Sequence, residues 1–133
     1  MRRLLPLIAG SLLLAGGTAG ASPRLDPEAR LARALEGRTA GEPVDCIFLR
    51  NVRSSQIIDK TAILYDAGGT VYVNRPRTGA ESLGRDDTLV TKTHSSRLCS
   101  IDTVDLYDSA SRTWRGVVFL GAFVPYRKPN LRD

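Results

Sequence analysis

The stretch TAILYDAGGTVYVN, residues 61–74, is the clearest indication of the fold class of this chain. Two runs of β-forming residues, 61–66 and 70–74, flank an Ala-Gly-Gly tripeptide. Side chains alternate between the two faces of a strand, so Val71 and Val73 fall on the face opposite Tyr72. Glycine permits the positive φ angles that tight hairpin loops require. The pattern predicts a β-hairpin.

Similar short runs continue on both sides of this hairpin. We expect strands at residues 44–49, 56–59, 88–93, 98–107, 113–120 and 122–126. Gly116 inside one run indicates a bulge or a close approach of another segment, and Pro125 is typical of a sheet edge. Strands at this spacing predict a mainly β domain, a small antiparallel barrel or sandwich of about six or seven short strands.

A short helix precedes the strands. Asp26, Pro27 and Glu28 form a helix-start pattern, and we expect the helix to end near Glu36, with Gly37 as its stop. This helix either plugs one end of a barrel or lies across a sheet. The predicted divisions are a signal peptide at 1–21, helix and linker at 22–42, the β domain at 43–128 and a tail at 129–133.

The first 21 residues, MRRLLPLIAGSLLLAGGTAGA, have the three-part layout of a secretory signal peptide. Two arginines precede an apolar run at residues 4–15, and the segment ends in an A-x-A cleavage site. The run is shorter than the about 20 residues of a membrane-spanning helix, the main alternative. We therefore expect cleavage after Ala21, no transmembrane segment in the mature chain, and a periplasmic or secreted protein.

The charge of the chain argues against nucleic acid as a partner. The formal charge is +5, and removal of Arg2 and Arg3 with the signal peptide leaves +3. The remaining basic residues are dispersed instead of forming the runs of nucleic-acid-binding arms. An envelope protein or a cell-wall component is the expected partner.

Cys46 and Cys99 are the two cysteines of the chain. An even cysteine count in an exported protein predicts a disulfide. Two buried free thiols are the alternative, and the spacing does not match a redox-active C-x-x-C pair. With a single histidine in the sequence, we expect no metal site and no cofactor.

Several blocks of sequence together resemble a family of small exported bacterial proteins that is known only as a domain of unknown function. The blocks, within residues 41–126, are Asp45-Cys46-Ile47, Val52-Arg53-Ser54, Ile57-Ile58-Asp59, Val71-Tyr72-Val73-Asn74, the run 96–104 (SRLCSIDTV) and the run 120–125 (LGAFVP). The resemblance implies no activity.

The resemblance also bears on the disulfide. Many members of that family carry a second cysteine pair, at positions matching Gly79 or Ala80 and the neighbourhood of Phe119, where this chain has none. The joint loss implies that those two positions are partners, which leaves Cys46 paired with Cys99. It also implies that Gly79 and Ala80 lie near Phe119 in space.

Few residues are candidates for chemistry. His94 beside Ser95 and Ser96 could act as a general base, with Asp86, Asp87 or Asp102 as its orienting acid, although a solvent-facing histidine explains it more simply. Asp102 and Asp105 interrupt an apolar run, and we interpret Asp102 as the structural acid of the two.

Arginines and aromatic residues are candidates for binding. Arg50, Arg53, Arg75 and Arg77 would form a phosphate or carboxylate site if the fold gathered them, with scattered, solvated arginines as the default alternative. Tyr65, Tyr72, Tyr107 and Trp114 would likewise form a binding surface, with sheet packing as the alternative.

Two functions follow from these observations. The first is a non-catalytic exported module of the cell envelope that binds or inhibits a partner. The second is a small periplasmic hydrolase that uses His94. The hydrolase requires His94, a serine and a carboxylate to converge in a pocket, whereas an exposed apolar or aromatic patch would favour the binding module.

Overall fold

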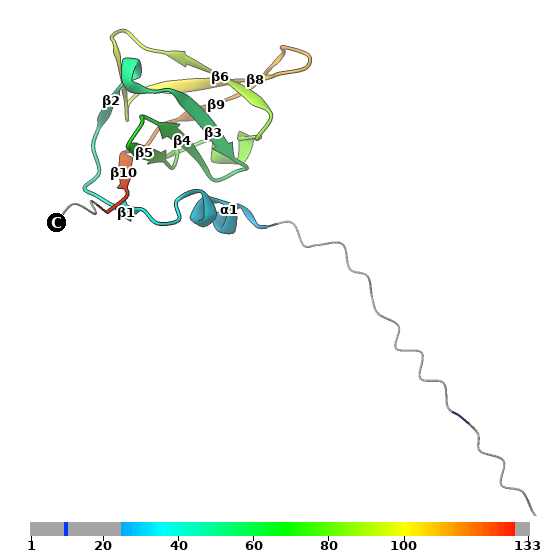
Figure 1. The fold of residues 1–133 in the computed structure, drawn as a ribbon. Coiled ribbons are helices and arrows are strands. Elements are labelled where there is room, and N and C mark those ends of the chain that lie inside the picture. The colour runs from blue at the N-terminus through cyan, green and yellow to red at the C-terminus, as the bar shows by residue number, and fades with distance from the viewer. Residues whose placement is uncertain (1–9, 11–24, 130–133) are drawn as a thin grey trace, which may run out of the picture.

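The computed structural model describes Gly10 and residues 25–129 (Figure 1). Its elements are α1 (Pro27–Ala34), β1 (Thr39–Ala40), β2 (Cys46–Phe48), the 3-10 turn η1 (Leu49–Asn51), β3 (Ser54–Ile58), β4 (Ala62–Asp66), β5 (Thr70–Asn74), η2 (Ala80–Ser82), β6 (Asp87–Lys92), β7 (Arg97–Cys99), β8 (Thr103–Asp108), β9 (Trp114–Phe119) and β10 (Phe123–Arg127). The predicted signal peptide, Gly10 apart, and residues 130–133 of the predicted tail lie outside this description. Within the described residues no helix has the length and hydropathy to cross a membrane.

The strands form three antiparallel sheets. A five-stranded sheet has the order β1-β10-β5-β4-β3, a three-stranded sheet has the order β6-β8-β9, and β2 pairs with β7. Across residues 25–129 these sheets form a sandwich instead of a closed barrel, which confirms the mainly β prediction and decides between its two architectures.

The described residues form ten strands, more than the six or seven expected, and two local features add to the number. The predicted linker contributes β1, because Thr39 and Ala40 pair with the end of β10. The predicted strand at 98–107 is two strands, β7 and β8, separated by a turn. In that turn the Asp102 amide donates to the Cys99 carbonyl (2.9 Å), and the Asp102 carboxylate accepts from the Cys99 amide (2.7 Å). A side chain that bonds the main chain locally competes with the strand ladder.

The predicted hairpin is β4–β5. Leu64 pairs with Val73, and the loop contains Gly68 at φ +82°. Because side chains alternate, Ile63 and Tyr65 face the three-stranded sheet, while Leu64 faces α1. Both faces of β4 are therefore buried, which explains its continuous apolar sequence.

The main core lies between the two larger sheets. It contains Ile47, Ile57, Ile63, Tyr65, Leu83, Leu98, Val104, Leu106, Val118, Leu120 and Phe123. Asn74 lies in this core with no exposed surface, and its side-chain amide pairs with the main chain of Gly121. This pairing joins the end of β5 to the connection between β9 and β10.

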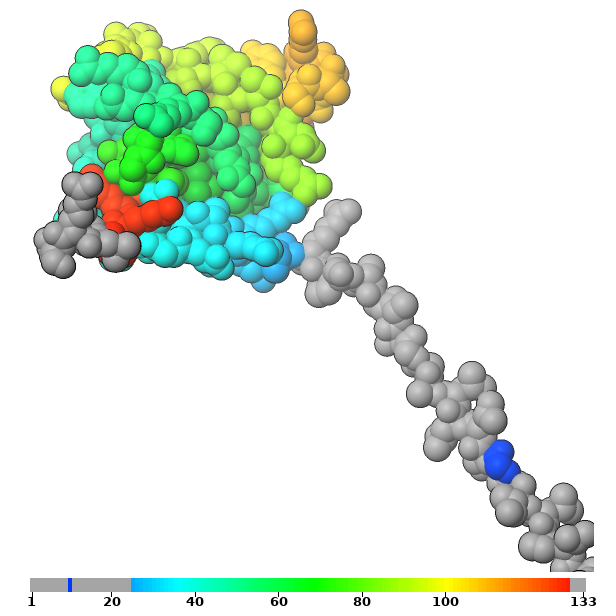
Figure 2. Space-filling model, viewed as in Figure 1, coloured from blue at the N-terminus to red at the C-terminus, as the bar shows by residue number. Residues whose placement is uncertain are grey.

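A second core lies between α1 and the opposite face of the five-stranded sheet. Leu31 and Leu35 contribute the helical side of this core. Asp26 caps the helix as predicted, since its carboxylate accepts from the Ala29 amide at 2.7 Å. The helix ends at Ala34, before the expected Glu36, and Gly37 follows at φ +75°. Figure 2 shows α1 lying across the same side of the body as β10, so the helix covers a sheet.

The disulfide joins Cys46 to Cys99, as predicted. The two cysteines are directly opposite each other in the β2–β7 ribbon, and the neighbouring Ile47 and Leu98 are buried in the main core. Each strand of this ribbon has three residues. An isolated pair of strands is marginally stable at best, so the disulfide and the two buried side chains hold the ribbon in place.

The segment before η2 packs against β9. Thr78 forms an isolated bridge with Phe119, and a Cβ added at Gly79 would lie 2.5 Å from the Val117 carbonyl oxygen. The expected proximity of Gly79 and Phe119 is therefore confirmed. Gly116 shows both predicted features, a bulge and a close approach of another segment. It adjoins the register shift between β8 and β9, and a Cβ added at Gly116 would lie 3.3 Å from the Ser82 side chain.

Pro125 is in β10, which is an edge only in part. The amide and carbonyl of Phe123 both bond to Val44, on the side away from β5. Pro125, two residues further on, turns its ring nitrogen to that same side. There its carbonyl accepts from the Gly41 amide (2.7 Å), and the two-residue β1 covers only the end of the strand.

Candidate functional site

His94 lies in the connection between β6 and β7 and is exposed. Asp102 bonds within its own turn, and Asp87 bonds to Arg115. No hydrogen bond joins His94 to a serine or a carboxylate in the part of the chain that the structure describes. The arrangement that a hydrolase needs is therefore not assembled around His94 among these residues.

Both acids in the predicted 98–107 run have structural roles. Asp102, interpreted as the structural acid, is half-buried and accepts from the Cys99 amide, and Asp105 is the more buried of the two. Asp105 lies on the outer face of the three-stranded sheet but is only 8% exposed. Its carboxylate accepts from Lys92 at 2.9 Å and from the Trp114 indole at 3.2 Å. Hydrogen bonds from Lys92 and then Trp114 lower the pKa of the Asp105 carboxyl. Asp102 is half-buried and serves its turn.

Arg75 and Arg77 bond to the protein itself. Arg75 makes a two-point pair with Glu28 of α1, at 2.8 and 3.0 Å. Arg77 donates to the carbonyls of Leu120 (2.8 Å) and Ser100 (3.3 Å). Their guanidinium groups fasten the helix and the β9–β10 connection, so these two arginines are engaged in the fold and do not join Arg50 and Arg53 in one site.

The four aromatic candidates also separate. Tyr65 is buried in the main core, where desolvation raises the pKa of its hydroxyl. Tyr72 is half-buried, and Tyr107 and Trp114 face outward from the three-stranded sheet. Trp114 is 57% exposed and shares that outer face with exposed Val90 and Phe119. This apolar face is one accessible surface of the molecule.

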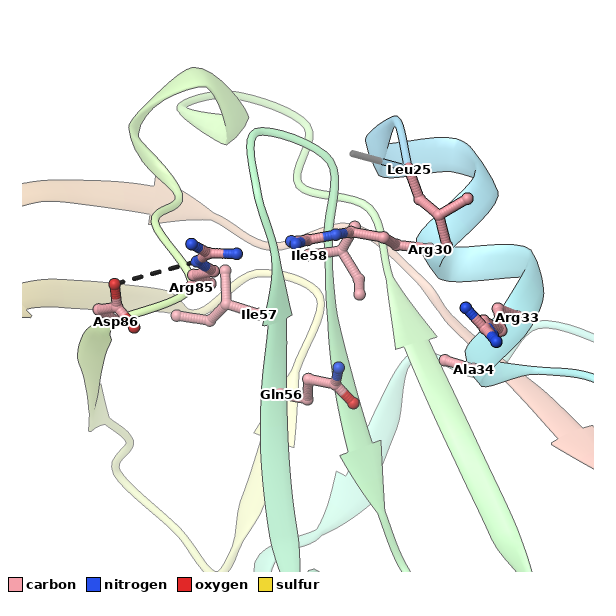
Figure 3. Close-up of a pocket in the computed structure, with 9 residues that line it drawn as sticks. All are labelled: Leu25, Arg30, Arg33, Ala34, Gln56, Ile57, Ile58, Arg85 and Asp86. Atoms are coloured by element: carbon pink, nitrogen blue, oxygen red, sulfur yellow. Dashed lines mark ion pairs between the residues drawn. The ribbon is translucent and has the colours of Figure 1, made fainter. Parts of the chain in front are cut away.

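A more concave surface lies between α1 and β3 (Figure 3). This α1 groove has a volume of about 700 Å³ and is lined by Leu25, Arg30, Arg33, Ala34, Gln56, Ile57, Ile58, Arg85 and Asp86. Helical spacing places Arg30, Arg33 and Ala34 on one side of α1. Figure 3 shows Arg30 extending from the helix past Ile58 toward Arg85.

The α1 groove is cationic over an apolar floor. Three arginines and one aspartate line it. Arg30 lies 3.5 Å from Asp59, which also accepts from the Arg85 amide at 2.7 Å. The pair between Arg85 and Asp86 is long, at 4.0 Å, and exposed, so it neutralises little charge. Within residues 25–129 Arg33 forms no ion pair.

A second groove opens on the other face of β3. This β6 groove has a volume of about 360 Å³ and is lined by Ser55, Gln56, Ile57, Arg85, Asp87, Thr88 and Leu89. β3 is the edge strand of the five-stranded sheet and has β4 as its neighbour on one side. The unpaired side of β3 thus lies between two grooves, and Arg85 lines both of them.

A third groove lies at the beginning of β3, beside the β2–β7 ribbon. This β2 groove has a volume of about 440 Å³ and is lined by Val44, Cys46, Ile47, Phe48, Arg50, Asn51, Arg53, Ala67, Thr70 and Tyr72. The exposed Phe48 ring lies 5.5 Å from the Arg50 guanidinium carbon and 4.9 Å from that of Arg97, within cation–π range. Two arginines and no acidic residue line this groove.

The arginines therefore gather at both ends of β3, although not in the predicted combination. Arg50 and Arg53 lie at its beginning, and Arg30, Arg33 and Arg85 lie at its end. The sequence offered a signal for the helical pair, since Arg30 and Arg33 are three apart in a capped helix. The position of that helix beside β3, in contrast, depends on pairing between distant segments.

The chain matches no family model, no curated protein and no solved structure. The resemblance to the family of unknown function stays a prediction.

Proposed function

We propose that the protein is a non-catalytic, exported binding module of the cell envelope, and that it binds an anionic partner along β3. One observation carries this proposal: arginine-lined grooves lie at both ends of an open edge strand. Guanidinium groups form two-point hydrogen bonds with carboxylates and phosphates. Apolar side chains in the groove floors add contact area to this charge recognition.

The unequal use of the arginines supports this location. Arg75, Arg77 and Arg115 bond to groups of the protein itself. Arg33 and Arg53, in contrast, form no ion pair within the described residues and are exposed beside grooves. Exposed charges without partners make anion binding possible at little cost in stability.

The disulfide supports the proposed location in the cell. Disulfides persist in oxidising compartments such as the periplasm or the extracellular medium. The Cys46–Cys99 bond is compatible with export, as is the signal-peptide pattern at residues 1–21. The intact mass of the purified protein tests this part directly. It should fit residues 22–133 and rise by about two hydrogens on reduction, and a mass that retains residues 1–21 would contradict export with cleavage.

The binding site is tested by crosslinking in the envelope of an expressing host. The tagged protein is compared with the variant Arg33→Gln/Arg53→Gln and with a control, Arg112→Gln/Lys128→Gln, which removes the same charge from exposed positions outside the grooves. We expect the unmodified protein and the control to recover the same partner, and the groove variant to recover less. Equal recovery by all three proteins would refute the proposed site.

A further inference from the structure

We infer that the anionic partner is an extended acidic peptide that pairs with β3 as an additional strand of the five-stranded sheet. This inference rests on the binding function proposed above and names its ligand. Edge strands present a row of unpaired amide and carbonyl groups, and an extended peptide can satisfy them.

The first three residues of the β3 edge are unprotected compared with the opposite edge of the same sheet. Natural edges are commonly blocked by proline, lysine, bulges or a covering segment. At the opposite edge, β1 and Pro125 perform this role. The exposed part of β3 is Ser54, Ser55 and Gln56, which are small or neutral polar residues that leave the main chain accessible.

The grooves on the two faces of β3 match the alternation of a paired strand. Ile57 points toward the three-stranded sheet and Ile58 points toward α1. A strand laid against β3 would send successive side chains in these same two directions. One set would enter the β6 groove and the other the α1 groove, so both sets would have a place to bind.

The charges indicate that the peptide is acidic at both ends. β3 has five residues, which span roughly 15 Å at about 3.3 Å per residue. A paired segment of about seven residues therefore reaches from Arg53 at one end to Arg30 and Arg33 at the other. Carboxylates at the two ends of such a segment would meet guanidinium groups at both positions.

The same charges disfavour a second copy of this chain as the occupant. Antiparallel pairing of two β3 strands would place Arg53 of each copy beside Arg30 and Arg33 of the other. Parallel pairing would place each of these arginines beside its own equivalent. Either arrangement opposes like charges across an edge, which is unfavourable.

The test uses a capped seven-residue peptide, Glu-Val-Thr-Val-Thr-Val-Glu, and the same peptide with alternate amide nitrogens methylated. Methylation removes the donors of the edge that pairs with β3 but keeps the charge. We expect the first peptide to bind and to slow hydrogen exchange at alternate β3 amides. Each lost main-chain bond should weaken binding roughly fivefold, so the methylated peptide should bind at least about tenfold more weakly.

The variant Arg33→Gln/Arg53→Gln should bind the first peptide roughly tenfold more weakly, while the control Arg112→Gln/Lys128→Gln should bind it normally. Equal binding of both peptides, with weakening by the arginine variant, would overturn strand addition and leave the anionic site standing. Binding to phosphatidylglycerol vesicles but to neither peptide would identify a lipid surface instead. A dimer in sedimentation with protected β3 amides and no peptide would identify a second copy. Failure of every anionic probe would overturn the proposed function as well.

Discussion

Asn74 is the last residue of β5 and lies inside the main core. Its side chain forms hydrogen bonds with the main chain of Gly121, which lies between β9 and β10 and belongs to neither strand. Its amide nitrogen donates to the Gly121 carbonyl at 2.8 Å, and its carbonyl oxygen accepts from the Gly121 amide at 2.9 Å. Both residues are buried. Replacing Asn74 with alanine would leave a donor and an acceptor of Gly121 in the core without partners.

The expected cost follows from these two bonds. Leaving a buried polar group unsatisfied costs about 1–3 kcal/mol, so the loss of both partners of Gly121 should lower the free energy of unfolding by about 3 kcal/mol. A domain of this size loses about 4 °C of melting temperature per kcal/mol, which predicts a decrease of roughly 12 °C. The main chain around Gly121 has little room to shift and find other partners. A Cβ added at Gly121 would lie only 2.5 Å from the Arg75 carbonyl oxygen.

The measurement is urea unfolding of Asn74→Ala, followed by circular dichroism, with Asn51→Ala as the matched control. Asn51 is exposed in η1 and makes none of these bonds, so its replacement should change stability by less than about 0.5 kcal/mol. A loss below about 1 kcal/mol in Asn74→Ala, or equal losses in both variants, would contradict this prediction. Such a result would mean that Gly121 finds other partners.

Three further predictions concern stability. Reduction of the Cys46–Cys99 disulfide opens a loop with a sequence separation of 53 and should destabilise the fold by up to about 4 kcal/mol; guanidinium unfolding with and without reductant measures this, and an unchanged midpoint would contradict it. Gly79→Ala should destabilise the fold strongly, because Gly79 has φ +89° and an added Cβ would lie 2.5 Å from a β9 carbonyl oxygen. The control Gly69→Ala should not, because a Cβ at Gly69 would meet nothing within 4 Å. Equal melting temperatures for the two variants would show that the clash at Gly79 is relieved. Asp105 has a lowered pKa in the folded state, so its contribution to stability is present above the ordinary aspartate pKa and is lost as the pH falls through the folded-state pKa. The stability difference between the wild type and Asp105→Asn should therefore shrink between pH 7 and pH 2.5 in urea titrations, and a constant difference would rule out this carboxylate as its source.

Local signals in the sequence were enough for several elements. The glycines between residues 66 and 70 predicted the β4–β5 hairpin, and Asp26 with Pro27 predicted the start of α1. The disulfide followed from the number of cysteines and the predicted compartment. Each of these features depends on residues close together in the chain or on simple composition, so no knowledge of the tertiary contacts was needed.

Features that depend on distant contacts were predicted less well. The run at 98–107 has the composition of one strand, and only the bond from the Cys99 amide to Asp102 shows why it breaks. Asp105 is buried, and the indole of Trp114 in the next strand donates to its carboxylate. Periodicity indicates that two such acids occupy different faces, but not which face receives the covering side chain.

The candidate site shows the same limit more clearly. Arg75 and Arg77 were candidates for a ligand site if the fold gathered them, but Glu28 and the Leu120 carbonyl engage them. Glu28 precedes Arg75 by 47 residues, and no local pattern connects them. The gathering of arginines around β3 arises because α1 packs beside this edge, which is a property of the topology.

The position of β10 has a consequence for the order in which the chain can fold. This last strand lies between β1 and β5, and Thr39 near the beginning of the described chain pairs with Arg127 near its end. Contacts between such distant residues require closure of long loops, which slows folding. The five-stranded sheet cannot be completed while the C-terminal segment is still being synthesised. The β1–β10–β5 part of the sheet therefore forms only once β10 is available, which suits a protein that crosses a membrane before it folds, as we propose for this one.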